Sequence, residues 1–119
     1  MQVAVVLFTC LVAFVFVLAG MARLQGLHAS DVVRERLGLP VGLWRFVGVV
    51  ELTGALGLIV GVFAVPPLAV ASAVGFVLLT VCAVGFHARA GDLRPGATAA
   101  LVMAVLSGLD AWLVQTYVG

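Results

Sequence analysis

The chain contains three long stretches with almost no charge, and no other feature limits its fold as much. Residues 1–22 carry no charged side chain, and residues 46–86 carry only Glu51. Residues 96–118 carry only Asp110. A membrane-spanning helix needs about 20 apolar residues. With 65% hydrophobic and 9% charged residues, against about 25% charged in a globular domain, the chain is too apolar for a water-soluble body, and we expect an integral membrane protein.

Two polar connections, residues 23–45 and 87–95, and a pair of prolines divide these stretches into four spans. Pro66 and Pro67 remove two backbone donors and restrict the residue before them, so a helix should end there. We therefore predict one domain, residues 1–119, that is an all-α antiparallel four-helix bundle. Its spans are expected over about residues 2–23, 43–64, 67–87 and 96–118. The first span lacks the basic segment that opens a signal peptide, so we expect no cleavage there.

The first polar connection is expected to contain a short amphipathic helix that lies at the membrane interface. Ser30 suits the N-cap of this helix, and Gly38, followed by Pro40, suits its C-terminal end. Arg34, Glu35 and Arg36 would stay in water, while an apolar side would dip into the interface. That apolar side comprises Val32, Val33 and Leu37. A solvated connector that is only partly helical is the alternative interpretation.

The distribution of arginine predicts the orientation in the membrane. The Pro66–Pro67 turn and both ends of the chain carry no arginine. All six lie in the two polar connections, which an antiparallel bundle puts on one side: Arg23, Arg34, Arg36, Arg45, Arg89 and Arg94. By the positive-inside rule this side faces the cytoplasm, so we expect both termini outside the plasma membrane. The net charge of only +1 argues against a nucleic-acid partner.

Small residues recur at helical spacing in the last three spans. Helices in lipid associate by close packing, which small residues permit. The motifs are Gly57-x-x-x-Gly61, Ala71-x-x-x-Gly75 and Ala104-x-x-x-Gly108. They would serve packing inside one bundle, or alternatively a homo-oligomer or a protein partner in the lipid.

Glu51 is the most informative polar residue. It lies about 10 Å below the cytoplasmic end of the second span, at 1.5 Å per residue. A carboxyl group in hydrocarbon is costly, so Glu51 should face the bundle interior and be paired or protonated. Arg23 and His87 close neighbouring spans at the same end, and we expect a polar cluster of the three. The cluster is either a structural ion pair or a ligand or proton site. Arg45 lies on a different face of its helix.

Asp110 marks a second polar site, about 20 Å into the fourth span and toward the outer leaflet. We expect it to be hydrogen-bonded there, with Thr9, Cys10 or Ser72 as the partner. Trp44 has the position of an anchor at the membrane interface. The two cysteines and two histidines lack the spacing of a metal site, so we expect no metal.

The order of these motifs resembles that of the DoxX-like family of small four-span membrane proteins. The elements that carry the likeness are Gly20-x-x-Arg23, Gly38-Leu39-Pro40, Arg45-x-x-Gly48-x-x-Glu51-x-x-Gly54-Ala55-Leu56-Gly57-Leu58 and His87-x-Arg89-x-Gly91-Asp92. The family is similar to subunits of thiosulfate:quinone oxidoreductase, and other members look like accessory partners of redox or stress proteins. The resemblance implies functional positions at Arg45, Glu51 and His87, and nothing in the chain resembles a catalytic dithiol.

Three functions are compatible with these features. The first is a non-catalytic accessory or scaffold subunit of a membrane redox system, as the resemblance implies. The second is the binding of a lipophilic molecule, such as a quinone or a lipid, with Glu51, Arg23 and His87 as its polar contacts. The third is a small proton-coupled transporter, which ranks last because the membrane carboxylate does not lie on the first span. We expect no independent catalytic activity and no other cofactor.

Overall fold

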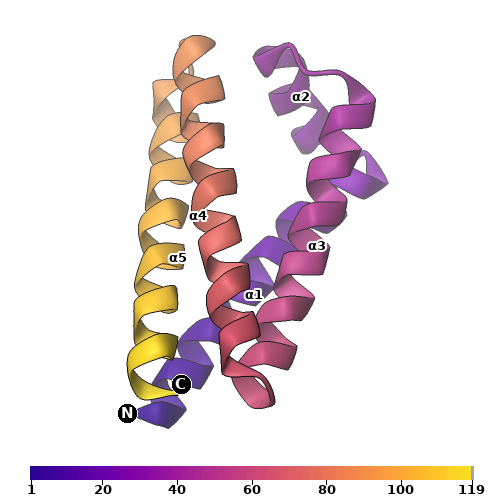
Figure 1. The fold of residues 1–119 in the computed structure, drawn as a ribbon. Coiled ribbons are helices and arrows are strands. Elements are labelled where there is room, and N and C mark those ends of the chain that lie inside the picture. Colours follow the sequence, from indigo (N-terminus) through magenta and orange to yellow (C-terminus); the bar gives the residue numbers. More distant parts are fainter. Residues whose placement is uncertain (119) are drawn as a thin grey trace.

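The computed structural model describes residues 1–118, all of whose regular elements are helices (Figure 1). In chain order they are α1 (Gln2–Gln25), α2 (His28–Leu37), α3 (Val41–Phe63), α4 (Pro66–Arg89), the irregular turn η1 (Leu93–Ala97) and α5 (Thr98–Tyr117). Four segments are long and apolar enough to cross a membrane: α1, α3, α4 and the run from η1 through α5. The structure therefore confirms the predicted all-α membrane bundle. Gly119, the last residue of the predicted domain, lies outside the described residues.

Glycine and proline set the helix ends. Gly26 and Gly38 end α1 and α2 with φ of 65° and 69°, in the left-handed region that glycine adopts at helix C-termini. The helix α3 ends at Phe63, and α4 begins at Pro66, where a missing backbone N–H is harmless in the first turn. The turn between them therefore lies where the two prolines predict it.

The four long helices form two closely packed pairs, α1 with α3 and α4 with α5, joined mainly by contact between α3 and α4. Met1, Val118 and the Pro66 turn lie at the same end of the bundle, which we call the proline end (Figure 1). The opposite end, with α2, η1 and all six arginines, is the arginine end. Large apolar side chains are exposed on the flanks of the bundle, as on a surface solvated by lipid.

The helices α1 and α3 approach each other at two glycines. A Cβ atom on Gly20 would lie 2.9 Å from the carbonyl oxygen of Gly48, and one on Gly48 would lie 3.0 Å from that of Gly20. The first distance is too short for a real Cβ atom, and the second is shorter than most contacts that Cβ atoms make. Backbone therefore packs on backbone at this point, close to the arginine end.

The helices α3 and α4 pack tightly near the proline end and diverge toward the arginine end (Figure 1). Near the proline end, glycines of α3 face α4: Gly61 packs on Ala69, Gly57 on Ser72 and Gly54 on the ring of Phe76. The Gly57-x-x-x-Gly61 motif thus serves packing within the bundle. Beyond Gly54 the α3 face carries larger side chains, and the two helices separate.

Phe76 lies at the point where α3 and α4 separate. Its ring stacks on that of Phe16 from α1, with ring centroids 3.7 Å apart and planes inclined by 11°. Ala55 and Leu58 of α3 are buried in the same apolar cluster. This cluster closes the inner end of the space between the diverging helices.

Candidate functional site

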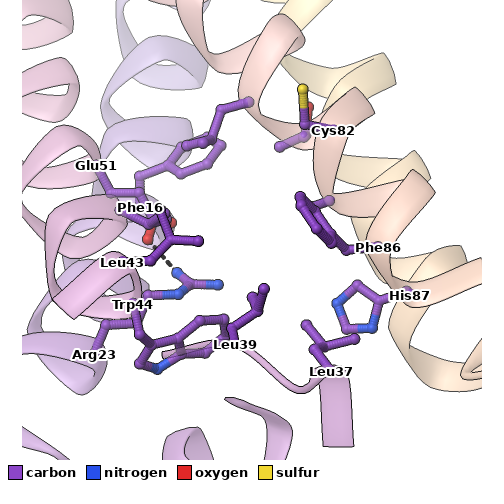
Figure 2. Close-up of a pocket in the computed structure, with 14 residues that line it drawn as sticks. Phe16, Arg23, Leu37, Leu39, Leu43, Trp44, Glu51, Cys82, Phe86 and His87 are labelled. Atoms are coloured by element: carbon purple, nitrogen blue, oxygen red, sulfur yellow. Dashed lines mark hydrogen bonds and ion pairs between the residues drawn. The ribbon is translucent and has the colours of Figure 1, made fainter. Parts of the chain in front are cut away.

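A cavity of about 140 Å³ lies between the diverging parts of α3 and α4 (Figure 2). An engineered cavity of about 150 Å³ is known to hold one benzene molecule, so this space fits a single six-membered ring. Most of its wall is apolar or aromatic. The polar side chains in the wall are Arg23, Glu51, Thr80 and His87, and the other lining residues are Phe16, Leu37, Leu39, Leu43, Trp44, Val47, Leu79, Cys82, Ala83 and Phe86.

Arg23 and Glu51 form an ion pair on one wall of the cavity. The Nη1 group of Arg23 donates a hydrogen bond to Oε1 of Glu51, whose side chain is only 5% exposed. The guanidinium also lies over the ring of Trp44, with Cζ 4.5 Å from the ring centroid. A carboxylate inside a membrane bundle needs such a partner. The Nε atom of Arg23 is buried and has no hydrogen-bond partner among the described residues.

His87 lies on the opposite wall, across the cavity from the ion pair (Figure 2). Its hydrogen-bond partner is Asp92, with 2.8 Å between Nδ1 and Oδ2. All three residues of the expected cluster thus line the cavity. Glu51 and Arg23 are in contact with each other, and His87 is separated from them by the cavity.

Asp92 belongs to the site but was not among the residues selected from the sequence. Its side chain is 5% exposed, although it lies in a polar connection, and Oδ2 is also 3.4 Å from Nη1 of Arg36. The hydrogen bond from His87, followed by the interaction with Arg36, lowers the pKa of Asp92 against the opposing effect of burial. Gly96 packs directly on Asp92 and His87, and a side chain at that position would collide with both. In the sequence, the position of Asp92 five residues after His87 is the feature that could have indicated this contact.

Arg45 lies outside the cavity. Its side chain is exposed, and it forms no ion pair within residues 1–118. Successive residues of a helix are rotated by about 100°, so Arg45 points outward where its neighbour Trp44 points inward. The expectation that Trp44 anchors the protein at the interface is wrong, because its side chain is buried, 5% exposed, in the cavity wall.

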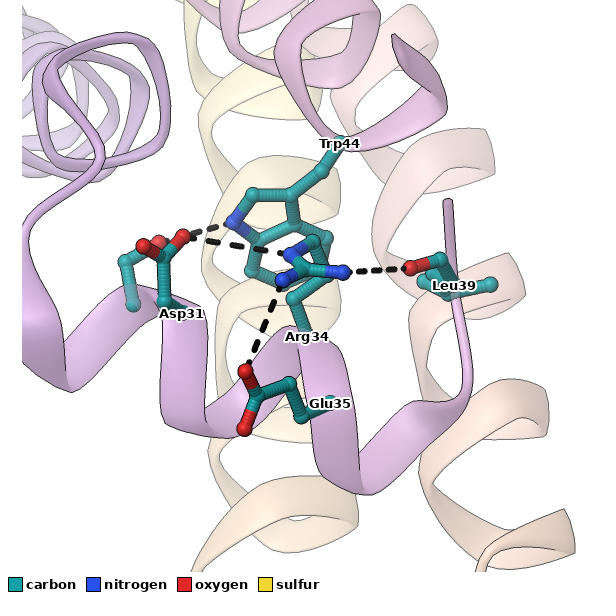
Figure 3. Close-up of polar contacts among 6 residues, drawn as sticks. Asp31, Arg34, Glu35, Leu39 and Trp44 are labelled. Atoms are coloured by element: carbon teal, nitrogen blue, oxygen red, sulfur yellow. Dashed lines mark hydrogen bonds and ion pairs between the residues drawn. The ribbon is translucent and has the colours of Figure 1, made fainter. Parts of the chain in front are cut away.

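The helix α2 covers the arginine end of the cavity. Trp44 donates a hydrogen bond of 2.8 Å from Nε1 to Oγ of Ser30. The sequence predicted Ser30 as the N-cap of α2, but Leu27 holds that position. The Ser30 hydroxyl instead accepts the hydrogen bond from the buried indole N–H. Arg34 donates a hydrogen bond of 3.1 Å to the carbonyl of Leu39, which stabilises the turn into α3 (Figure 3).

Asp110 forms a separate polar site nearer the proline end. The hydroxyl of Thr9 donates a hydrogen bond of 2.5 Å to its Oδ1 atom, and both residues are fully buried. Of the three expected partners, Thr9 is thus the one in contact, while Ser72 packs against Gly57 instead. The Oδ2 atom of Asp110 and the hydroxyl of Ser107 have no partner within residues 1–118.

These features define a four-span membrane protein with a ring-sized, mostly apolar cavity near one end, into whose wall a few polar side chains are built. The chain matches the DoxX-like family over residues 7–109 and belongs to that family. No curated protein and no solved structure matches it. Within residues 1–118, no group of three His, Cys, Asp or Glu side chains is placed to hold a metal ion.

Proposed function

We propose that this DoxX-like protein binds a small lipophilic molecule of the quinone class in the cavity. The observation that supports this most is the placement of Arg23 and His87 on opposite walls of an apolar, ring-sized space. A quinone carries an oxygen at each end of one ring, and two polar side chains facing each other match that pattern. Trp44 and Phe86 add aromatic surface for the ring.

The contacts that hold Arg23 and His87 in place support distinct roles for these two groups. Arg23 keeps its position through Glu51, and this pair uses one of the five N–H groups of the guanidinium. When Nδ1 of His87 carries the proton, it donates a hydrogen bond to Asp92. The Nε2 atom can then accept a hydrogen bond from a hydroxyl of the reduced quinol. The imidazolium form would instead donate to a carbonyl of the oxidised quinone.

Tryptophan fluorescence tests the proposal, since quinones quench tryptophan on contact. The chain has two tryptophans, and Trp112→Phe leaves Trp44 in the cavity wall as the reporter. In lipid nanodiscs, decylubiquinone should quench this variant saturably. Adding His87→Ala should weaken binding about tenfold, the loss of one good hydrogen bond. Adding Arg45→Ala, on the outer surface, should leave binding unchanged.

Two results would contradict the proposal. One is quenching that rises linearly with quinone and never saturates, which indicates collision in the lipid. The other is equal binding by the His87→Ala and Arg45→Ala variants. Mass spectrometry of the lipid extract from protein purified in mild detergent gives an independent readout, because a resident quinone should be depleted by His87→Ala.

An accessory role in a membrane redox system is the second function that we propose, and it is compatible with the first. Gly75 and Gly85 on α4 support it: both are exposed, and an added Cβ would meet no atom within 4 Å. Small residues on a lipid-facing helix allow another helix to approach closely. A partner should copurify in stoichiometric amount with the wild type and be lost in Gly75→Leu, while Val105→Phe on the exposed face of α5 should retain it. Purification of the wild type alone would contradict this role.

We further propose that the protein lies in the plasma membrane with its arginine end toward the cytoplasm. The support is the positive-inside rule, applied to six arginines at one end of the bundle.

A further inference from the structure

The cavity is bounded by lipid-facing side chains on one flank. Leu43 of α3 and Cys82 of α4 line it, and both are also exposed on the outer surface of the bundle. We call the part of the cavity wall that carries these two exposed side chains the lateral opening. Both residues belong to helices that are long and apolar enough to cross a membrane. Cys82 lies seven residues before Arg89, the last residue of α4, which is about 10 Å inside the end of the helix, so its exposed side faces lipid. A molecule that leaves the cavity through this opening enters the bilayer rather than water.

The side toward water is closed by α2 and the turn that follows it. Leu37 and Leu39 line the cavity there, and Leu37 is buried. Arg36, next to Leu37, reaches across to Asp92 beyond the end of α4, with 3.4 Å between Nη1 and Oδ2. The Trp44–Ser30 hydrogen bond ties α2 to α3 as well. This closure is therefore held by polar contacts on both sides of the cavity.

The depth of the polar groups limits the kind of molecule that fits. Glu51 lies ten residues after Val41, the first residue of α3, which is about 15 Å along the helix axis. His87 lies two residues before Arg89, the last residue of α4, which is about 3 Å along that helix, so the polar groups extend from the end of the bundle inward. A phospholipid headgroup exceeds one ring in size, so it does not match a cavity of about 140 Å³. A compact ring does match it.

We propose that the molecule bound in the cavity is a bilayer-resident amphiphile, a single-ring head on a long apolar chain, which enters sideways from the lipid through the lateral opening. The ring lies between Arg23 and His87, and the chain stays in the lipid beyond Leu43 and Cys82. This inference rests on the proposed binding function and adds the form of the ligand and its route.

The rate of entry tests the route. We would measure association of decylubiquinone by stopped-flow quenching of Trp44, in nanodiscs and in the Trp112→Phe background. Cys82→Phe narrows the lateral opening and should slow association about tenfold, a barrier increase of about 1.4 kcal/mol. Leu78→Phe is the matched control, because Leu78 is exposed on α4 one turn away and does not line the cavity. It should associate at the wild-type rate.

Two further measurements separate this inference from the binding function itself. Arg36→Ala removes the contact that closes the water side and should leave the association rate unchanged; an increase of about tenfold would overturn entry from the lipid. Ubiquinone-0, the same head without a chain, should quench Trp44 saturably in the Leu78→Phe variant with close to its wild-type affinity, because Leu78 does not line the cavity. Equal association rates in Cys82→Phe and Leu78→Phe would overturn the inference while binding still stands. If neither ligand quenches Trp44 saturably in the parent protein, the proposed function itself fails.

Discussion

The Nδ1 atom of His87 lies 2.8 Å from the Oδ2 atom of Asp92, and this contact joins the cavity wall to the turn between α4 and α5. Arg36 of α2 approaches the same carboxylate oxygen. Asp92 therefore connects three parts of the arginine end: α2, the last turn of α4 and η1. A single buried carboxylate positions the histidine and helps to hold α2 over the cavity.

Asp92 should make the stability of the folded protein depend on pH in the acid range. Its pKa in the folded protein is lowered, so the carboxylate stabilises the fold above its unfolded pKa and loses this effect as pH falls through the folded pKa. The unfolding temperature in detergent should therefore drop as pH falls from about 5 to about 3. Asp92→Asn should flatten that drop, and Asp31→Asn, at a more exposed site on α2, should retain it. Identical pH profiles for the two variants would show that Asp92 is not held as described.

Glu51 is expected to be far more important for stability than Glu35. Removing one member of a buried pair strands the other charge, which costs about 3–5 kcal/mol. Glu51→Ala should therefore lower the unfolding temperature clearly, whereas Glu35→Ala should change stability by less than about 0.5 kcal/mol, since its side chain is 71% exposed. Replacing Arg23 and Glu51 together with apolar residues should recover much of the loss, because buried pairs often tolerate apolar replacement. Equal melting of the two single variants would contradict an interior pair.

Most of the fold could be predicted from the sequence because a membrane imposes few constraints on a helical chain, and each constraint corresponds to a pattern that can be recognised in the sequence. Span length follows from bilayer thickness, and the prolines at 66 and 67 interrupt the longest apolar run. The depth of Glu51 along α3 similarly indicates which neighbouring residues can reach it. Arg23, at the end of α1, was within that reach, and it is the residue that pairs with Glu51.

The rest of the site depends on tertiary contacts that depth along a helix does not encode. Asp92 is buried because the chain turns back after the last residue of α4, where Gly96 leaves room for the carboxylate. Trp44 stands at the end of a span, where tryptophan often marks the interface, yet α2 folds over it and Ser30 accepts its N–H. Arg45, one residue later, is turned to the outer surface by the helical rotation alone. The sequence indicated these residue types but not which of them the fold would enclose.

Gly20 should not tolerate a side chain, although alanine normally favours helices. A Cβ atom there would lie 2.9 Å from the backbone of α3, so the helices would have to move apart, and overpacking of this kind costs about 1–3 kcal/mol. Gly75→Ala is the control, since nothing lies within 4 Å and alanine gains up to about 1 kcal/mol over glycine in a helix. The unfolding temperature in detergent should fall for Gly20→Ala and should stay the same or rise for Gly75→Ala. Stabilisation of both would argue against close packing of α1 on α3.

Thr9 should matter through Asp110. Thr9→Val keeps the shape of the side chain but removes the donor to a fully buried carboxyl group, leaving both Asp110 oxygens without a partner among the described residues. Such a loss costs about 1–3 kcal/mol. The same exchange at exposed Thr53 should be close to neutral in the same unfolding assay. Should both variants unfold alike, the Thr9–Asp110 contact contributes nothing to stability.

The orientation in the membrane can be tested with single cysteines in a Cys10→Ser, Cys82→Ser background. Cysteines at exposed Gln2 and Ala64 report on the proline end, and one at exposed Ala90 reports on the arginine end. Because positive residues are retained on the cytoplasmic side, we expect an impermeant maleimide applied to intact cells to label the first two positions. The cysteine at Ala90 should react only after the cells are opened. Reversing the labelling would show that the arginine end lies outside, and it would place α2 and the closed side of the cavity on the opposite face of the membrane.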